Sequence, residues 1–202
     1  KSDLQSLLQC PRKLWLEHHR PDLIPKDDPT LYRRAIDGNI VGEKARSQLG
    51  RDFIWPQNDE DKSTAAERAK AVLERARQRP AAEVPMVNGD LYARADALIP
   101  EGGRYILRET KSSTFPLKND KVTPAAPKEH HLDDVAIQVW AMEGSGLAFA
   151  RAELNLLDNQ WRYPGDDDYS GLFRQLDVTI EVQARKNQVP GWLGQAQAVL
   201  AG

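Results

Sequence analysis

The sequence has few of the features that would indicate a disulfide framework, a membrane anchor or a strongly charged binding surface. Its single cysteine, Cys10, excludes an intrachain disulfide and any zinc or iron–sulfur site built from several cysteines of this chain. No apolar run approaches the roughly 18 residues that a membrane-spanning helix requires. The net charge of −2 argues against a coat protein that holds nucleic acid through its overall positive charge.

The length and composition are those of one ordinary globular domain. The chain has 202 residues, of which 40% are hydrophobic and 29% are charged. We expect an N-terminal helical segment over residues 1–80, a core over 81–157 and a C-terminal helical tail over 158–202. Residues 1–15 lack the apolar centre of a secretory signal, so a cytoplasmic location is expected.

Apolar spacing and helix-breaking residues predict where the helices lie. Helices are predicted within residues 2–19, with a break at Cys10-Pro11, and then over 35–50, 65–79, 130–143 and 171–184, with a last short helix from Pro190. The prolines and aspartates of residues 20–34 predict a loop. Thr64 and Glu67 form a capping box that opens the third helical run.

Four segments are rich in strand-forming residues. They lie at residues 82–88, 91–99, 104–112 and 147–157, and glycine-containing turns join the first three into a meander. A helix and another strand follow this meander, so the sequence predicts an α/β fold.

The second hairpin carries two carboxylates and a lysine. Side chains alternate along a strand, so Glu109 and Lys111 point the same way, and Asp96 in the partner strand can approach them. Two carboxylates hold a hard cation such as Mg²⁺ or Mn²⁺, and an ammonium can orient the attacking water. The arrangement suits a phosphodiesterase, although Glu-x-Lys pairs on exposed strands are commonly only solvated charges.

A few other polar residues have both a functional and a structural interpretation. Arg12 and Lys13 are candidate phosphate contacts, or a surface pair beside a buried Trp15. Glu43 lies on the flank of its helix and is either a site residue or a solvated charge. The neighbouring Gly38 and Gly42 are poor helix formers, which suggests that another element or a substrate comes close.

Four short stretches occur in an order characteristic of one protein family. They are CPRKLWL at residues 10–16, GNIVGEKAR at 38–46, RADALIP with LRETKSST within 94–114, and DDVAIQVW at 133–140. Together they resemble the PD-(D/E)xK nuclease superfamily, and specifically its RecB-like exonuclease branch. The resemblance covers about residues 2 to 157.

The resemblance implies a restriction-endonuclease-like core, with a mixed central sheet of about four to five strands flanked by helices. It implies Mg²⁺- or Mn²⁺-dependent hydrolysis of phosphodiester bonds, usually in DNA. By position, Asp96, Glu109 and the Thr110 carbonyl would hold the metal, and Lys111 would position the water. Glu43 would be the acid of the first motif. By the same resemblance, Gln138 would contact the substrate backbone or the water network.

Three positions depart from the family pattern. Cys10 is alone, so no iron–sulfur cluster is expected; the first-motif histidine is absent, with Glu43 one residue away; and Met142 replaces the last tyrosine. The chain is also similar to a bacterial group in which such a domain precedes an RNase H-like domain, which would make this chain the N-terminal part.

Two functions therefore remain at this point. One is a metal-dependent DNA nuclease, favoured as an end-processing exonuclease because Asp96, Glu109 and Lys111 are all present. The other is a catalytically silent module of the same fold that binds nucleic acid or a partner protein.

Overall fold

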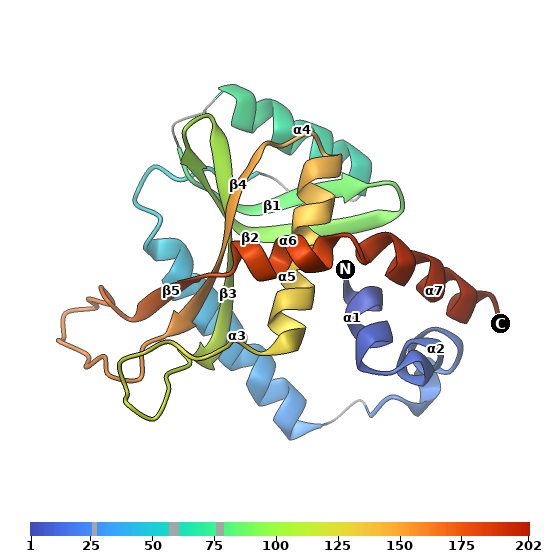
Figure 1. Ribbon diagram of the computed structural model, residues 1–202, viewed down its shortest axis with the longest axis horizontal. Helices are drawn as coiled ribbons and strands as arrows, with labels where there is room; N and C mark the ends of the chain where they lie inside the picture. Colours follow the sequence, from blue (N-terminus) through green and yellow to red (C-terminus); the bar gives the residue numbers. More distant parts are fainter. Residues whose placement is uncertain (26–27, 57–60, 76–78) are drawn as a thin grey trace.

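Figure 1 shows the computed structural model of the chain, in which helices flank a central sheet. The structure describes residues 1–25, 28–56, 61–75 and 79–202. The loop predicted over 20–34 includes residues 26–27, and the helix predicted over 65–79 includes residues 76–78. Residues 26–27 and 76–78 lie outside the described residues.

Five described strands form the sheet in sequence order. They are β1 (Ala81–Asn88), β2 (Leu91–Glu101), β3 (Arg104–Thr114), β4 (Phe149–Leu157) and β5 (Phe173–Asp177). All neighbours are antiparallel except β3 and β4, which are parallel and joined through α5 (Glu129–Gly144). The predicted α/β class is confirmed, with the mixed five-stranded sheet expected of a restriction-endonuclease-like core. The four predicted strands are also confirmed.

Helices cover both faces of this sheet. The other described helices are α1 (Ser2–Gln9), α2 (Pro11–His19), a 3-10 turn η1 (Pro21–Leu23), α3 (Pro29–Ser47), α4 (Lys62–Arg75), α6 (Thr179–Lys186) and α7 (Val189–Ala201). Helix α5 lies in front of the strands in Figure 1 and α3 lies behind β3. Helices α1, α2 and α7 pack together beside α5. Among the described helices, none is both long and apolar enough to cross a membrane.

The two faces of the sheet differ in polarity. On the α5 side, leucines and isoleucines such as Leu107, Ile137 and Leu154 are completely buried, and each contributes about 1.5–3 kcal/mol of hydrophobic stabilisation. On the α3 side, polar side chains run across three strands. The Asn155 amide donates to Thr110 Oγ1 at 3.3 Å, and the Gln175 amide donates to Asn155 Oδ1 at 2.8 Å. The side of the sheet beneath α3 is therefore built for polar contacts.

The N-terminal part of α3 corrects the loop predicted over residues 20–34. The helix begins at Pro29, and Asp28 caps it, since its Oδ1 accepts the Thr30 N–H at 2.8 Å. Proline at the first position of a helix costs nothing because its missing N–H would have no partner there. Asp28-Pro29 is thus a helix start, and its interpretation as a helix breaker was wrong.

The start of α4 corrects the capping box predicted at Thr64. The helix begins at Lys62, and Asp61 Oδ1 accepts the Thr64 N–H at 2.7 Å. Asp61 is therefore the capping residue, and Thr64 lies inside the first turn. An aspartate can cap a helix as well as threonine can, so the sequence contained two competing start signals.

The predicted helix over 171–184, and with it the all-helical tail over 158–202, is wrong. Residues Phe173–Asp177 form β5, and α6 begins only at Thr179. Leu176 pairs with Leu154 along β4, whereas Ile180, in the first turn of α6, is 83% exposed. The apolar spacing fitted a helix, but pairing with β4 satisfies its backbone groups, which local spacing cannot predict.

The burial expected of Trp15 is also wrong. Trp15 lies at the surface of α2 and stacks near His19, with ring centroids 4.9 Å apart. Leu14 is the buried residue of this helix, with no exposed surface. One position along a helix turns a side chain by about 100°, so neighbouring apolar residues cannot both face the core.

Candidate functional site

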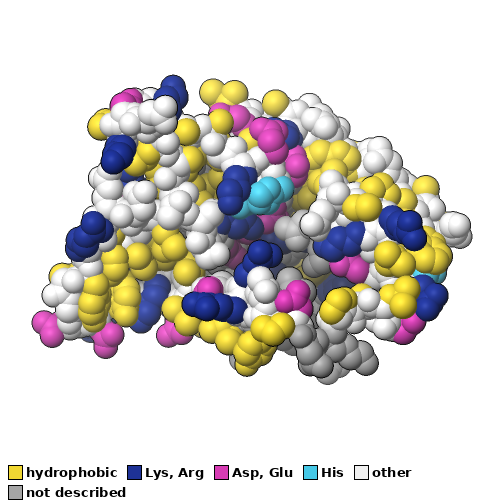
Figure 2. Space-filling view, turned by 90° about the horizontal axis from the view of Figure 1, so that it is seen from below, with side chains coloured by type: hydrophobic (Ala, Val, Ile, Leu, Met, Phe, Trp, Pro, Cys, Tyr) yellow, Lys and Arg dark blue, Asp and Glu magenta, His cyan; other side chains and the backbone are white. Residues whose placement is uncertain are grey.

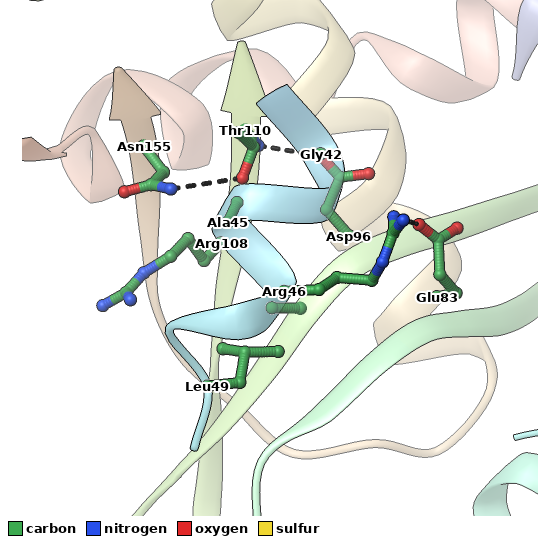
Figure 3. Close-up of a pocket in the computed structure, with 10 residues that line it drawn as sticks. Gly42, Ala45, Arg46, Leu49, Glu83, Asp96, Arg108, Thr110 and Asn155 are labelled. Carbon is green, nitrogen blue, oxygen red and sulfur yellow. Dashed lines mark hydrogen bonds and ion pairs between the residues drawn. The ribbon is translucent and has the colours of Figure 1, made fainter. Parts of the chain in front are cut away.

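The site begins where β2 and β3 separate. Their paired residues end at Ala97 and Arg108, and Asp96 is the next residue of β2 beyond this point. One Asp96 carboxylate oxygen accepts the Thr110 N–H at 2.8 Å, so the side chain bridges the fork, and Figure 3 shows its other oxygen pointing away from Thr110. The carboxylate is therefore held in place by β3 while keeping an oxygen open.

Beyond the fork, β3 presents Glu109 and Lys111 to helix α5. Lys111 Nζ lies 2.6 Å from Glu109 Oε1 and also contacts the Asp134 carboxylate. The Gln138 amide donates to Glu109 Oε2 at 2.7 Å and lies 3.4 Å from Asp134 Oδ1. Glu109, Asp134 and Gln138 are at most 3% exposed. Together with Asp96, these residues are called the carboxylate–lysine cluster below.

A second lysine, Lys1, immediately precedes α1 and reaches the same carboxylates. Lys1 Nζ lies 3.1 Å from Asp134 Oδ1 and 3.4 Å from Glu109 Oε1. Two ammonium groups therefore face the carboxylates of Asp96, Glu109 and Asp134. A buried group of like charges is stable only when such countercharges are present.

Burial and mutual charge set the protonation states of the cluster. Burial, together with the negative charges of Asp96 and Asp134, raises the pKa of Glu109 to about 7. Burial also opposes the charged form of Asp134, but Lys111 and Lys1 outweigh it, and the pKa of Asp134 is lowered. Burial would lower the pKa of Lys111, yet Glu109 and Asp134 raise it above its usual range. Lys111 is therefore held in its protonated form and donates to Glu109 and Asp134.

The oxygen donors of the cluster suit a hard divalent cation. Asp96, Glu109 and the Thr110 carbonyl supply only oxygen ligands, which Mg²⁺ and Mn²⁺ prefer. Asp96 is half-buried, and the partial loss of solvent is the chief cause of its raised pKa; a nearby cation would favour its ionised form. Over the described ranges, no three acidic, histidine or cysteine side chains already form a metal-binding group. A cation here would thus be held by two carboxylates, a backbone carbonyl and water.

Two cavities meet at the cluster. The α3 cavity, of about 330 Å³, lies between α3 and strands β1–β3. The α1 cavity, of about 520 Å³, lies between α1 and α5, and Gln5 and Gln9 are among the residues that line it. Lys111 lines both cavities. Figure 2 shows a hollow in which basic, acidic and histidine side chains gather. The cluster is therefore accessible from two sides.

Not every residue predicted for the site lies in it. The structure brings Asp96, Glu109, Lys111 and Gln138 together, with Thr110 beside them. Glu43 is exposed on α3 and is not among the residues that line the two cavities.

The two basic residues of α2 also lie apart from the cluster. Arg12 is exposed, and Lys13 Nζ contacts Gln9 at 2.7 Å and Glu17 at 3.5 Å. Gln9 lines the α1 cavity, so Lys13 is near its rim. A role for either residue in binding phosphate stays a prediction.

Asp134 is the site residue that sequence reasoning missed. Both Asp133 and Asp134 suit the start of a helix, where negative charge is favoured, and Asp133 lies outside the cluster in an ion pair with Arg185. The available signal was spacing: Asp134 precedes Gln138 by four residues, so both lie on one face of α5. Helix position explains why either acid is tolerated, but spacing distinguishes them.

His131, which lines the α1 cavity, yields a pH prediction. Burial, followed by the charges of His130, Lys111 and Lys128, lowers the pKa of His131 to about 4, against the opposing charge of Asp134. The unfolded side chain titrates near about 6.5. Between these values the unfolded chain binds a proton that the folded chain does not, so stability falls as the pH falls.

Between pH 7 and pH 4.5, wild type is therefore expected to lose about 2 kcal/mol more stability than a His131→Gln variant, which has no titrating group at this position. Urea denaturation of both proteins across this range measures the difference. The stability of wild type minus that of the variant should decrease as the pH falls. Parallel curves would show that His131 is as solvated in the folded chain as in the unfolded chain.

The fold and the cluster define a mixed α/β protein with a buried Asp–Glu–Lys site at a fork between two strands. No protein-family model and no curated protein matches the chain. Among solved structures, the crystal structure of SSO0001 is similar over 94% of this chain and 73% of that chain, with 15% identity and a TM-score of 0.44. A likeness of this size carries no argument about activity.

Proposed function

We propose that this chain is a metal-dependent nuclease that hydrolyses phosphodiester bonds in DNA, with end-processing exonuclease action as its favoured form. The observation that carries the proposal is the meeting of Asp96, Glu109 and Lys111 at the β2–β3 fork, beside open cavities. Two carboxylates and an ammonium in this arrangement suit hydrolysis of a phosphodiester. The family resemblance of the motifs supports the same reaction.

In this proposal each cluster residue has a distinct part. Asp96, Glu109 and the Thr110 carbonyl would hold Mg²⁺ or Mn²⁺, which supplies a water of lowered pKa and charge neutralisation at the phosphate. Lys111 keeps its proton, so it orients the attacking water and stabilises negative charge on the phosphate oxygens. Gln138 fixes one oxygen of Glu109, and Asp134 fixes the ammonium of Lys111.

The test is cleavage of end-labelled single-stranded and double-stranded DNA with Mn²⁺, with Mg²⁺ and with EDTA. We expect products with either metal and none with EDTA, because the carboxylates alone repel the phosphate. A ladder of shortened products from one end would indicate an exonuclease, and internal products an endonuclease. Equal cleavage in EDTA would contradict the proposal.

The silent-module alternative is favoured by one specific observation. Lys1 adds a second ammonium to that of Lys111 at the carboxylates of Glu109 and Asp134, so side chains of the protein balance these negative charges. Such a module would bind nucleic acid or a partner equally well in EDTA, since contacts between basic residues and phosphates need no metal. Binding without cleavage under every condition of the test would favour it.

A further inference from the structure

Two arginines share one glutamate at the edge of the α3 cavity. Arg46 Nη1 from α3 lies 2.8 Å from one oxygen of Glu83, and Arg94 Nε from β2 lies 2.8 Å from the other. Figure 3 shows Arg46 reaching from α3 across to Glu83 on β1. Each carboxylate oxygen thus holds one guanidinium, and three elements meet at this group, called the arginine pair below.

The backbone at Glu83 is held in an unfavourable conformation. Its φ is +53°, in the left-handed region that non-glycine residues avoid, although it lies inside β1. The flanking pairs Ala82–Ala97 and Val84–Ala95 place Glu83 beside Asp96 of the cluster. Strained backbone of this kind is concentrated at functional sites, where the fold positions a side chain that packing alone would not require.

The cavity beside the arginine pair is open toward α3. A Cβ at Gly38 would meet no atom within 4 Å, and one at Gly42 would meet only Arg46, at 3.5 Å. Neither glycine is therefore required to let another described element of the chain come close. Arg46, Arg94 and Lys111 all line this cavity, so two guanidinium groups and the cluster face the same space.

We propose that Arg46 and Arg94 bind the phosphodiester backbone of the substrate strand, at a phosphate next to the one that the cluster cleaves. The proposal rests on the nuclease function and names the contacts that position its substrate. Guanidinium groups match phosphate oxygens with paired hydrogen bonds, and both side chains remain partly exposed, by 25% and 49%. The Glu83 carboxylate holds the two guanidinium groups in place until a phosphate takes its position between them.

The experiment measures DNA binding in EDTA as a function of salt, so it does not depend on catalysis. The probes are a 20-nucleotide single strand and the matching duplex, with Arg46→Gln and Arg94→Gln beside wild type. Each variant is expected to weaken binding about tenfold and to reduce the salt slope by about 0.7 to 0.9, the change for one lost phosphate contact. With metal present, KM should rise about tenfold while kcat changes less than threefold.

Two controls separate phosphate binding from a structural role. Arg151 also joins two glutamates, Glu101 and Glu153, but it lines neither cavity, so Arg151→Gln should bind DNA as wild type does. Glu83→Gln keeps both arginines and should leave the salt slope unchanged or steeper. If the arginines served only to brace Glu83, all three cavity variants would lower stability alike and leave the salt slope at its wild-type value.

The outcomes distinguish this inference from the proposed function. Wild-type cleavage with unaltered binding by both arginine variants would overturn the inference and leave the nuclease in place. Loss of salt-dependent binding in those variants, with no cleavage by wild type, would support the phosphate contacts within a silent module. A wild-type chain that binds neither probe would overturn the inference.

Discussion

Replacing Lys111 by methionine is expected to reduce metal-dependent cleavage by at least about 1,000-fold, because the variant lacks the ammonium that would stabilise negative charge on the phosphate. Lys1 also brings an ammonium to the cluster, but it faces Glu109 and Asp134 and does not line the α3 cavity. The expected metal ligands remain in this variant, so Mn²⁺ binding measured by calorimetry should persist. Cleavage of labelled DNA and metal titration of the same preparation together measure the effect.

Lys186 provides a matched control for this substitution. It is a similarly enclosed lysine on α6, its Nζ lies 2.8 Å from Glu143, and it lines neither cavity. Lys186→Met should therefore keep wild-type cleavage, while circular dichroism checks that both variants are folded. Full activity in Lys111→Met would show that the catalytic site has been assigned to the wrong residues.

Replacing Asp134 by alanine is expected to lower the free energy of unfolding by about 3 kcal/mol in EDTA. Asp134 is 1% exposed and contacts Lys111 and Lys1, so its loss leaves buried positive charge poorly compensated. Cleavage should fall about 10- to 100-fold, since Lys111 keeps its charge but loses the contact that orients it. Urea denaturation measures the first effect and steady-state kinetics the second.

A double variant tests whether the effect comes from unpaired charge. Lys111→Met with Asp134→Ala removes both charges, so its loss of stability should be at least about 2 kcal/mol smaller than the sum of the two single losses. It should remain inactive, which separates stability from catalysis. Additive losses would mean that the two side chains do not interact in the folded chain, contrary to the contact described above.

The hairpin residues could be predicted because their geometry is local. The two glycines at positions 102 and 103, with φ of 56° and 79°, bring β2 and β3 together, and the period of two along β3 points Glu109 and Lys111 the same way. Their approach to Gln138 was expected from the motif resemblance. The functional roles of these residues stay predictions.

Helix rotation limited what could be said of α3. Glu43 was expected in the site, yet Gly38, Asn39 and Gly42 line the α3 cavity and Glu43 is exposed. Each residue turns the helix by about 100°, so the identity of the inward face depends on how the whole helix sits on the sheet. The weak apolar pattern of α3, above a polar sheet face, did not specify that rotation.

The sequence by itself determined the meander, the α5 crossover and the local placing of Asp96, Glu109 and Lys111, since turns and strand period act over a few residues. Only the tertiary structure decided that Asp134 and Lys1 complete the cluster, that Glu83 holds Arg46 and Arg94, and that residues 173–177 form β5. Those contacts join segments far apart in the chain, and their energy comes from burial and pairing of charges that exist only once the segments have packed together.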